Sequence, residues 1–186
     1  MLLLIQISLI ISQIALIAAI IIFTYQSIVF GISGGFDVPF VATPHSYFPL
    51  IARALNIRDG DLVYDLGSGS GELLLYLAKK FPNARFVGIE RNLFLHTQAR
   101  IKKKFTKVPN VAFRRENFFT TDLGDATRIY VYLLPSILER LFSISALRCR
   151  IASRAFAING RPVTETVELS QRPGWHGQHL LHIYEL

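Results

Sequence analysis

The segment from Asp65 to Glu72 carries the residues whose types and spacing are the most informative about chemistry. It reads Asp-Leu-Gly-Ser-Gly-Ser-Gly-Glu and lies between two apolar runs, 62–64 and 73–78. Glycine is needed where the backbone adopts a positive φ or where a ligand approaches without a Cβ in the way. The pattern therefore predicts a strand, a tight glycine turn and a helix start, and a helix N-terminus behind such a turn favours a nucleotide-like ligand.

The spacing of the glycines distinguishes between two such ligands. Gly67, Gly69 and Gly71 read G-x-G-x-G, whereas a dinucleotide site usually reads G-x-G-x-x-G. Asp65 precedes the first glycine by two residues, and a second acid, Glu90, ends the next predicted strand 19 residues after Gly71. A carboxylate at that position of a βαβ unit accepts hydrogen bonds from both ribose hydroxyls. Together these features favour S-adenosylmethionine over NAD, although a glycine turn alone is often a plain connection between a strand and a helix.

The N-terminal segment has a different composition. No charged residue occurs before Asp37, and residues 2–23 are nearly all Leu, Ile and Ala. As a helix this stretch is about 33 Å long, enough to cross a hydrocarbon core of about 30 Å. A cleaved signal peptide is disfavoured because a basic N-terminal region is missing and the apolar segment is too long. A buried core helix is the other alternative.

We therefore expect a transmembrane anchor over 1–30, a linker and extended segment over 31–45, and a catalytic domain over 46–186. All 20 Lys and Arg and all 13 Asp and Glu follow residue 36, so the net charge of +7 belongs to the C-terminal part. A basic excess beside one span predicts a single-pass protein of the inner or cytoplasmic membrane with its catalytic domain facing the cytoplasm. Cys149 is the single cysteine, which excludes a disulfide or a cysteine-based metal site within one chain.

After Asp65 the pattern predicts an α/β domain with a mostly parallel sheet. Further helices are expected over 46–56, from after Glu90 to 105, and over 137–147. Further strands are expected over 111–114, 129–134, 149–156, 164–169 and 178–186, and the last two should pair as a hairpin. Ligands in such sheets bind beyond the carboxyl ends of the strands. Asn117 and Phe118 are thereby expected near the adenine, and Leu133 and Pro135 beside the reactive methyl. Asn117 as a turn or cap residue is an equal alternative.

Two further groups of residues invite other functions. Between Glu90 and Glu116 there are eight Lys or Arg and no acid, which indicates a nucleic-acid surface or, more commonly, a solvated, membrane-facing or dipole-complementing helix end. RNA methylation would need no membrane span, so a nucleic-acid partner is not expected. Three histidines, His176, His179 and His182, are spaced so that successive rings of a strand lie on opposite faces, and we expect no metal site.

Beyond Asp37 the chain resembles the membrane-anchored seven-β-strand protein-lysine methyltransferases, whose eukaryotic members modify the ATP synthase c subunit and the adenine nucleotide translocase, together with their bacterial relatives. The resemblance rests on segments 38–44, 63–71, 87–90, 116–119 and 126–136, and the Tyr-Leu-Leu-Pro-Ser at 132–136 is the most specific. It implies a Rossmann-like class I methyltransferase fold, S-adenosylmethionine as donor, and a lysine of a membrane protein as acceptor. Two departures stand out: Ser70 and Glu72 replace an acid and an arginine common in the family, and only residues 157–162 separate two strands, as in a minimal member.

Methyl transfer from a sulfonium to a neutral amine depends mainly on placement of the reactants. A lysine acceptor must first lose its proton, against an ordinary pKa of about 10.4. We expect Tyr132 and the backbone carbonyls from Leu133 to Pro135 to position the acceptor nitrogen; packing of Tyr132 within the sheet is the alternative. The residues expected to bind the cofactor are Asp65, Gly67, Ser68, Gly69, Gly71, Glu72, Glu90, Asn117, Phe118 and Leu133.

Two other functions stay open at this point. A methyltransferase for a lipid or quinone headgroup is expected to expose further apolar surface around the site. A non-catalytic membrane adapter that retains the fold is expected to have lost Asp65 or Glu90, and both acids are present.

Overall fold

The computed structural model describes residues 2–31, 41–144, 147–170, 177 and 179–186. The chain divides into two compact units, residues 1–35 and 36–186. The predicted glycine-rich joint and the segment 38–40 fall almost entirely outside the described residues, and the three-part division of the chain remains a prediction.

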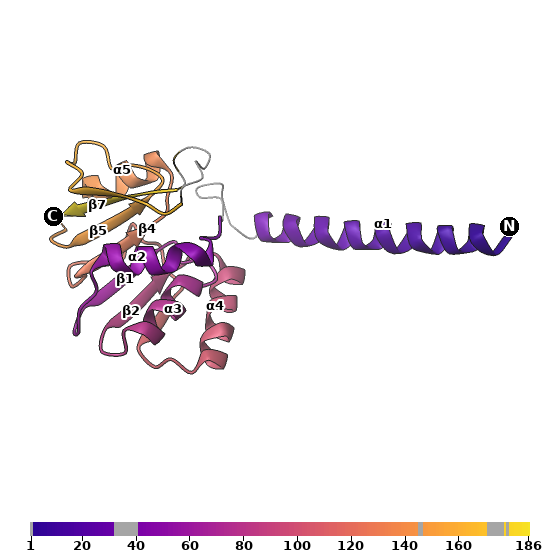
Figure 1. The fold of residues 1–186 in the computed structure, drawn as a ribbon, viewed down its shortest axis with the longest axis horizontal. Coiled ribbons are helices and arrows are strands. Elements are labelled where there is room, and N and C mark those ends of the chain that lie inside the picture. The colour runs from indigo at the N-terminus through magenta and orange to yellow at the C-terminus, as the bar shows by residue number, and fades with distance from the viewer. Residues whose placement is uncertain (1, 32–40, 145–146, 171–176, 178) are drawn as a thin grey trace. The chain divides into compact units, whose positions relative to one another are not determined.

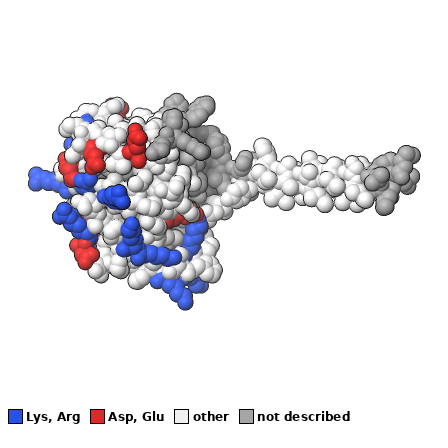
Figure 2. Space-filling view, viewed as in Figure 1, with Lys and Arg blue, Asp and Glu red and all other residues white. Residues whose placement is uncertain are grey.

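The first unit is the helix α1, Leu2–Gly31. Within it, Gln6–Tyr25 is long and apolar enough to cross a membrane, the one such helix among the described residues. Two of its hydroxyl groups form local hydrogen bonds: Ser12 donates to the carbonyl of Leu9, and Thr24 donates to the carbonyl of Ile20. Such bonds reduce the penalty of a hydroxyl in an apolar environment. Figure 2 shows no charged side chain along the described length of this helix.

The second unit contains a seven-stranded sheet in the order β3-β2-β1-β4-β5-β7-β6 (Figure 1). The strands are β1 Leu62–Leu66, β2 Arg85–Ile89, β3 Val111–Arg114, β4 Arg128–Val131, β5 Arg150–Arg154, β6 Glu165–Glu168 and β7 Leu180–Glu185. β1 to β5 pair in parallel, and β7 is antiparallel to both β5 and β6. The expected mostly parallel sheet with a C-terminal antiparallel hairpin is confirmed.

Two apolar layers cover the sheet. The helical elements are η1 His45–Tyr47, α2 Phe48–Leu55, α3 Glu72–Lys80, α4 Leu93–Thr106 and α5 Pro135–Ile144. Side chains of α2 and α3 form one core with Val63 of β1, whereas α5 forms a second core with Tyr64 and Leu66. Alternate residues of a strand point to opposite faces, so this single strand is buried on both sides, as a central parallel strand must be.

The predicted limits of most elements differ from the observed ones by one or two residues, and the largest differences are at β4 and α5. β4 ends at Val131 rather than at residue 134, and α5 begins at Pro135 rather than at residue 137. Proline suits the first position of a helix because its missing N–H has no partner there. The carbonyl of Leu134 accepts from the amides of Ile137 and Leu138, both at 3.0 Å, and so starts the helix. Residues 132–134 therefore form a loop at the carboxyl end of β4.

The connection between β5 and β6 is short, as expected. β5 ends at Arg154, and Ala155 follows with a φ of 70° that stops the strand. Residues 155–164, all of them described, contain no helix. The prediction of a minimal domain without a helix at this place is confirmed.

Candidate active site

The glycine turn after β1 depends on all three of its glycines. Gly67, Gly69 and Gly71 have φ values of 83°, 54° and 77°, in the region that side chains disfavour. A Cβ on Gly71 would lie 2.4 Å from the ring of Phe113, and one on Gly67 would lie 3.3 Å from Leu133. The turn is therefore enclosed by strand β3 on one side and by the loop after β4 on the other.

Backbone hydrogen bonds hold this turn in place. The amides of Gly67 and Ser68 both donate to the carbonyl of Ile89, at 2.9 and 3.0 Å, which ties the turn to the end of β2. Gly71 is the N-cap of α3 and has no side chain to cap the helix. The first N–H groups of α3 can therefore donate hydrogen bonds to a ligand or to water. The hydroxyl of Ser68 is buried and has no hydrogen-bond partner among the described residues.

Glu90 bridges the glycine turn and the start of α4. One carboxylate oxygen accepts from the amide of Gly69 at 2.9 Å and the other from the amide of Asn92 at 2.7 Å. Burial raises the pKa of Glu90, while the backbone donors of Asn92, Gly69 and Arg91 act in the opposite direction. Each carboxylate oxygen has capacity for a second hydrogen bond, so the acid can hold the turn and still accept from a ligand hydroxyl.

Asp65 is the second acid of the site. It is 4% exposed and lies on β1 between Gly88 of β2 and Tyr130 of β4. Burial, and secondly the negative charge of Glu90, raise the pKa of Asp65 to about 8. Two carboxyl groups thus lie at the carboxyl ends of adjacent strands, and the raised pKa of Asp65 means that this edge of the sheet disfavours a second negative charge. Such an edge favours a ligand that brings positive charge.

The loop after β4 closes the other side of the turn. Leu133 is buried against Gly67, as described above, and Tyr132 is half-buried with the guanidinium of Arg154 4.2 Å from its ring centroid. Arg154 also lies 5.2 Å from the ring of Tyr47. A guanidinium over an aromatic face is an attractive cation–π contact. Tyr132 thus packs within the domain through its ring, the alternative that the sequence left open.

A polar network that the sequence did not predict joins the segment before α2 to the sheet. The hydroxyl of Thr43 accepts from Arg154 Nη1 at 3.0 Å and lies 3.2 Å from the hydroxyl of Tyr130. Tyr130 and Arg154 are both buried, and burial raises the pKa of the Tyr130 phenol. The local sequence gives no sign of this network, because Arg154 ends a strand that also contains Arg150 and Ser153.

Glu72, at the rim of the glycine turn, forms ion pairs with two neighbouring elements. Its carboxylate accepts from Lys102 of α4 and lies 2.6 Å from Nε2 of His45 in η1. The hydrogen bond from Lys102, and then that from His45, lower the pKa of Glu72. The side chain thereby connects three elements around the glycine turn, and a direct role in cofactor binding remains a prediction.

Asn117 and Phe118 follow β3 at the same edge. The side-chain oxygen of Asn117 accepts from the amide of Phe119 at 3.1 Å, which is the turn role expected as the alternative to adenine binding. Phe118 packs on Phe119 with ring centroids 4.7 Å apart. Contact of either residue with adenine remains a prediction.

Comparison with known proteins identifies the family. The sequence pattern of the ANTKMT methyltransferase domain matches residues 65–165, from the acid of the glycine turn to the start of β6. The chain belongs to this family. A protein-lysine N-methyltransferase of Saccharolobus islandicus (strain REY15A) is 27% identical over 142 residues, which cover 71% of this chain and 85% of the relative.

Solved methyltransferase structures share the fold of this domain. An RNA methyltransferase from Salinibacter ruber, in complex with S-adenosyl-L-homocysteine, superposes with a TM-score of 0.69 and 28% identity over 78% of this chain and 93% of that one. A methyltransferase from Thiobacillus denitrificans, also with S-adenosyl-L-homocysteine, gives a TM-score of 0.52 at 19% identity over 67% of this chain and 53% of that one, a likeness of fold alone. The ANTKMT-type domain has the class I fold, and the protein is an S-adenosylmethionine-dependent methyltransferase.

The site of this ANTKMT-type domain fits that cofactor. A Cβ on these glycines would fill the turn, the buried hydroxyl of Ser68 has unused hydrogen-bonding capacity, and a positive charge beside Asp65 would favour its ionised form. As for metals, the described part of the chain holds no group of three or more His, Cys, Asp or Glu arranged around a common point. His176 of the predicted histidine series lies outside the described residues.

Proposed function

We propose that this methyltransferase acts on a lysine side-chain amine of a membrane-associated protein. The observation that carries the proposal is the pairing of Arg154 with Tyr132, which brings a buried cation to the loop that packs on the glycine turn. A positive charge near an amine disfavours its protonated form. An acceptor that approaches Tyr132 is therefore shifted toward the neutral, nucleophilic state. The family and the relative from Saccharolobus islandicus support a protein lysine as that acceptor.

In this proposal the cofactor-binding residues have separate roles. The backbone of Gly67, Ser68, Gly69 and Gly71, with the first amides of α3, holds the methionine end, where Asp65 balances positive charge. Glu90 accepts from the ribose hydroxyls, and Asn117 and Phe118 face the adenine. Bound S-adenosylmethionine supplies an electrophilic methyl group.

The acceptor side is formed by the loop after β4. The side chain of Leu133 excludes water beside the turn, where it is only 2% exposed. The carbonyl of Leu134 already accepts two amides of α5, so we assign orientation of the amine lone pair to the hydroxyl of Tyr132 and the carbonyl of Leu133. Pro135 fixes the end of this loop as the first residue of α5.

Two other acceptors follow from the same fold. The first is a lipid or quinone headgroup, whose methylation would use the same cofactor site. The second is RNA, because the RNA methyltransferase from Salinibacter ruber shares the fold at 28% identity. These alternatives differ in the molecule that receives the methyl group, so identifying the methylated product distinguishes between them.

The test is incubation of the full-length protein with radiolabelled S-adenosylmethionine and membranes of its host. Protein, lipid and RNA are then separated, and labelled protein is hydrolysed to identify methyl-lysine. We expect the label in protein as methyl-lysine, and its loss when membranes are first treated to block lysine amines. A Glu90→Ala variant gives the background. Label confined to lipid or RNA, or no label in protein above this background, would refute a protein acceptor.

A further inference from the structure

Helix α4 has an apolar stripe on its outer side, opposite the side that packs on the domain. The buried residues of the helix are Leu95, His96 and Ala99. With 3.6 residues per turn, Leu93, Ile101 and Phe105 lie on the opposite side of the helix. They are 47%, 52% and 80% exposed. An exposed aromatic and two exposed aliphatic side chains on one helix face contribute nothing to the core of this domain.

Basic side chains flank the stripe. No acid occurs between residues 91 and 115, while eight Lys or Arg do. Lys102 is paired with Glu72 across the glycine turn. No described acid lies within ion-pair distance of Arg100, Lys103 or Lys104. Their charge is therefore available to a partner outside the domain.

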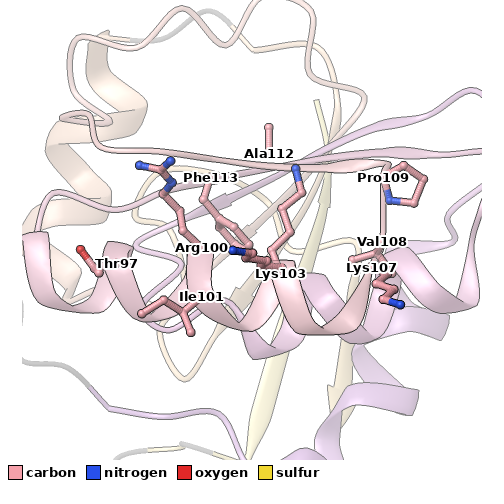
Figure 3. A pocket seen from close by; sticks show the side chains of 10 residues that line it. Thr97, Arg100, Ile101, Lys103, Lys107, Val108, Pro109, Ala112 and Phe113 are labelled. Carbon is pink, nitrogen blue, oxygen red and sulfur yellow. The ribbon is translucent and has the colours of Figure 1, made fainter.

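A groove of about 700 Å³ runs beside these residues, between α4 and β3. β3 is the terminal strand of the sheet, so the groove lies at an outer edge of the domain. Figure 3 shows Arg100 and Lys103 of α4 on one side of the groove and Ala112 and Phe113 of β3 on the other. The groove thus combines cationic groups with an apolar wall, which suits an anionic headgroup attached to an apolar chain.

We propose that the outer face of α4 and the adjoining groove bind the surface of an anionic lipid bilayer. The basic residues attract anionic headgroups, and Ile101 and Phe105 enter the boundary between headgroups and acyl chains, as in interfacial helices. A nucleic acid would bind the basic side chains but would leave the apolar stripe exposed to water. A second copy of this chain would bring like charges together. This inference rests on the proposed membrane association: if α1 spans a bilayer, the catalytic domain stays close to a lipid surface.

The experiment uses full-length protein in lipid nanodiscs, with an environment-sensitive fluorophore on the outer face of α4. Thr97→Cys places the label on an exposed position between Leu93 and Ile101, and the native Cys149 is buried. Glu139→Cys, at an exposed position of α5, is the control label because α5 belongs to the core on the other side of the sheet. We expect a blue shift and quenching by brominated lipid for the α4 label only, in discs with phosphatidylglycerol and not in discs of phosphatidylcholine alone.

A matched pair of variants tests the role of charge. Lys103 and Lys104 lie in the last turn of α4, and Lys79 and Lys80 lie in the last turn of α3. Each basic side chain near an anionic surface changes the ratio of docked to undocked domain by about fivefold. Lys103→Gln/Lys104→Gln should therefore lower this ratio by about 25-fold, whereas Lys79→Gln/Lys80→Gln should leave it unchanged. High salt should have the effect of the first variant.

Three results would overturn the proposal. One is an unshifted α4 label in anionic discs that hold folded protein, as judged by circular dichroism. A second is an equal shift in neutral and anionic discs, which would remove the role of the basic residues. The third is binding of a single-stranded RNA that depends on Lys103 and Lys104 without any lipid-dependent shift, which would make this face a nucleic-acid surface.

Discussion

Asp65 should lower the stability of the folded protein at neutral pH, and Asp65→Asn should relieve this effect. The carboxyl group is 4% exposed, and its pKa rises from 3.8 to about 8 through burial and the charge of Glu90. A group whose pKa is higher in the folded than in the unfolded state stabilises the fold fully below its unfolded pKa. That contribution is lost as the pH rises toward the folded pKa. For Asp65 the loss falls between about pH 4 and about pH 8.

The magnitude follows from the width of this window. Each unit of pKa difference corresponds to about 1.4 kcal/mol, so a shift from 3.8 to about 8 implies a destabilisation of up to roughly 4 kcal/mol at about pH 7. The neutral amide of asparagine keeps the size of the side chain and removes its titration. We expect Asp65→Asn to raise the free energy of unfolding by on the order of 2–4 kcal/mol at neutral pH. That gain corresponds to an increase in Tm of roughly 5–15 °C in a chain of this size.

Thermal unfolding of the full-length protein in a mild detergent, followed by circular dichroism across this pH range, measures the effect. The difference between Asp65→Asn and the wild type should be near zero at about pH 4, grow with pH, and level off above about pH 8. Equal stability of the two proteins at neutral pH, or a difference that does not change with pH, would refute the reasoning.

The same substitution should weaken cofactor binding. A cationic ligand favours the ionised form of Asp65, so wild-type affinity for S-adenosylmethionine should rise with pH up to about 8 and then level off. Loss of a charge-assisted contact corresponds to about 1.5–3 kcal/mol, or roughly 10- to 150-fold in Kd. Calorimetry should show weaker binding by Asp65→Asn and a flatter pH profile. Unchanged affinity and an unchanged profile would separate Asp65 from the cofactor.

Three further outcomes are expected. Glu90→Ala should weaken S-adenosylmethionine binding by about 1.5–3 kcal/mol in calorimetry, because the ribose hydroxyls lose a charged acceptor; unchanged affinity in a folded variant would contradict this role. Gly71→Ala should destabilise the protein by roughly 2–4 kcal/mol in thermal unfolding, because its φ of 77° and the 2.4 Å approach to Phe113 act together. Gly160→Ala, with a φ of 72° and nothing within 4 Å, is the matched control and should have a smaller effect. A protein lacking residues 1–36 should bind the cofactor normally but methylate membrane vesicles more slowly than the full-length protein, because tethering raises effective concentration; equal rates would show that the N-terminal segment does not target the substrate.

The glycine turn and its two acids were predictable because their signals are local. Positive φ angles at alternate positions require glycine, and an apolar run before the turn predicts a central strand. The limits of β4 were not predictable in the same way. Residues 129–134 form one apolar run, and only the hydrogen bonds from Ile137 and Leu138 to the carbonyl of Leu134 show that the helix takes over there.

The contacts around the turn could not be predicted because they join residues far apart in the sequence. Glu72 meets Lys102 and His45 from elements on either side of it in the chain. Thr43 meets Arg154 across most of the domain. Each pair is set by how α4, η1 and β5 pack against the sheet, which no local pattern of residue types encodes. The sequence therefore predicted the glycine turn and its two acids better than it predicted the side chains that surround them.

The arrangement of charge at the site connects these contacts to the proposed chemistry. The carboxyl groups of Asp65 and Glu90 lie on the β1 and β2 side of the turn, where burial raises the pKa of both, whereas the guanidinium of Arg154 lies behind Tyr132 on the β4 and β5 side. Leu133, buried against Gly67, lies at the junction of the two sides. In the proposed chemistry a cationic donor on the first side would favour the ionised form of Asp65, and the positive charge on the second side would disfavour a protonated amine.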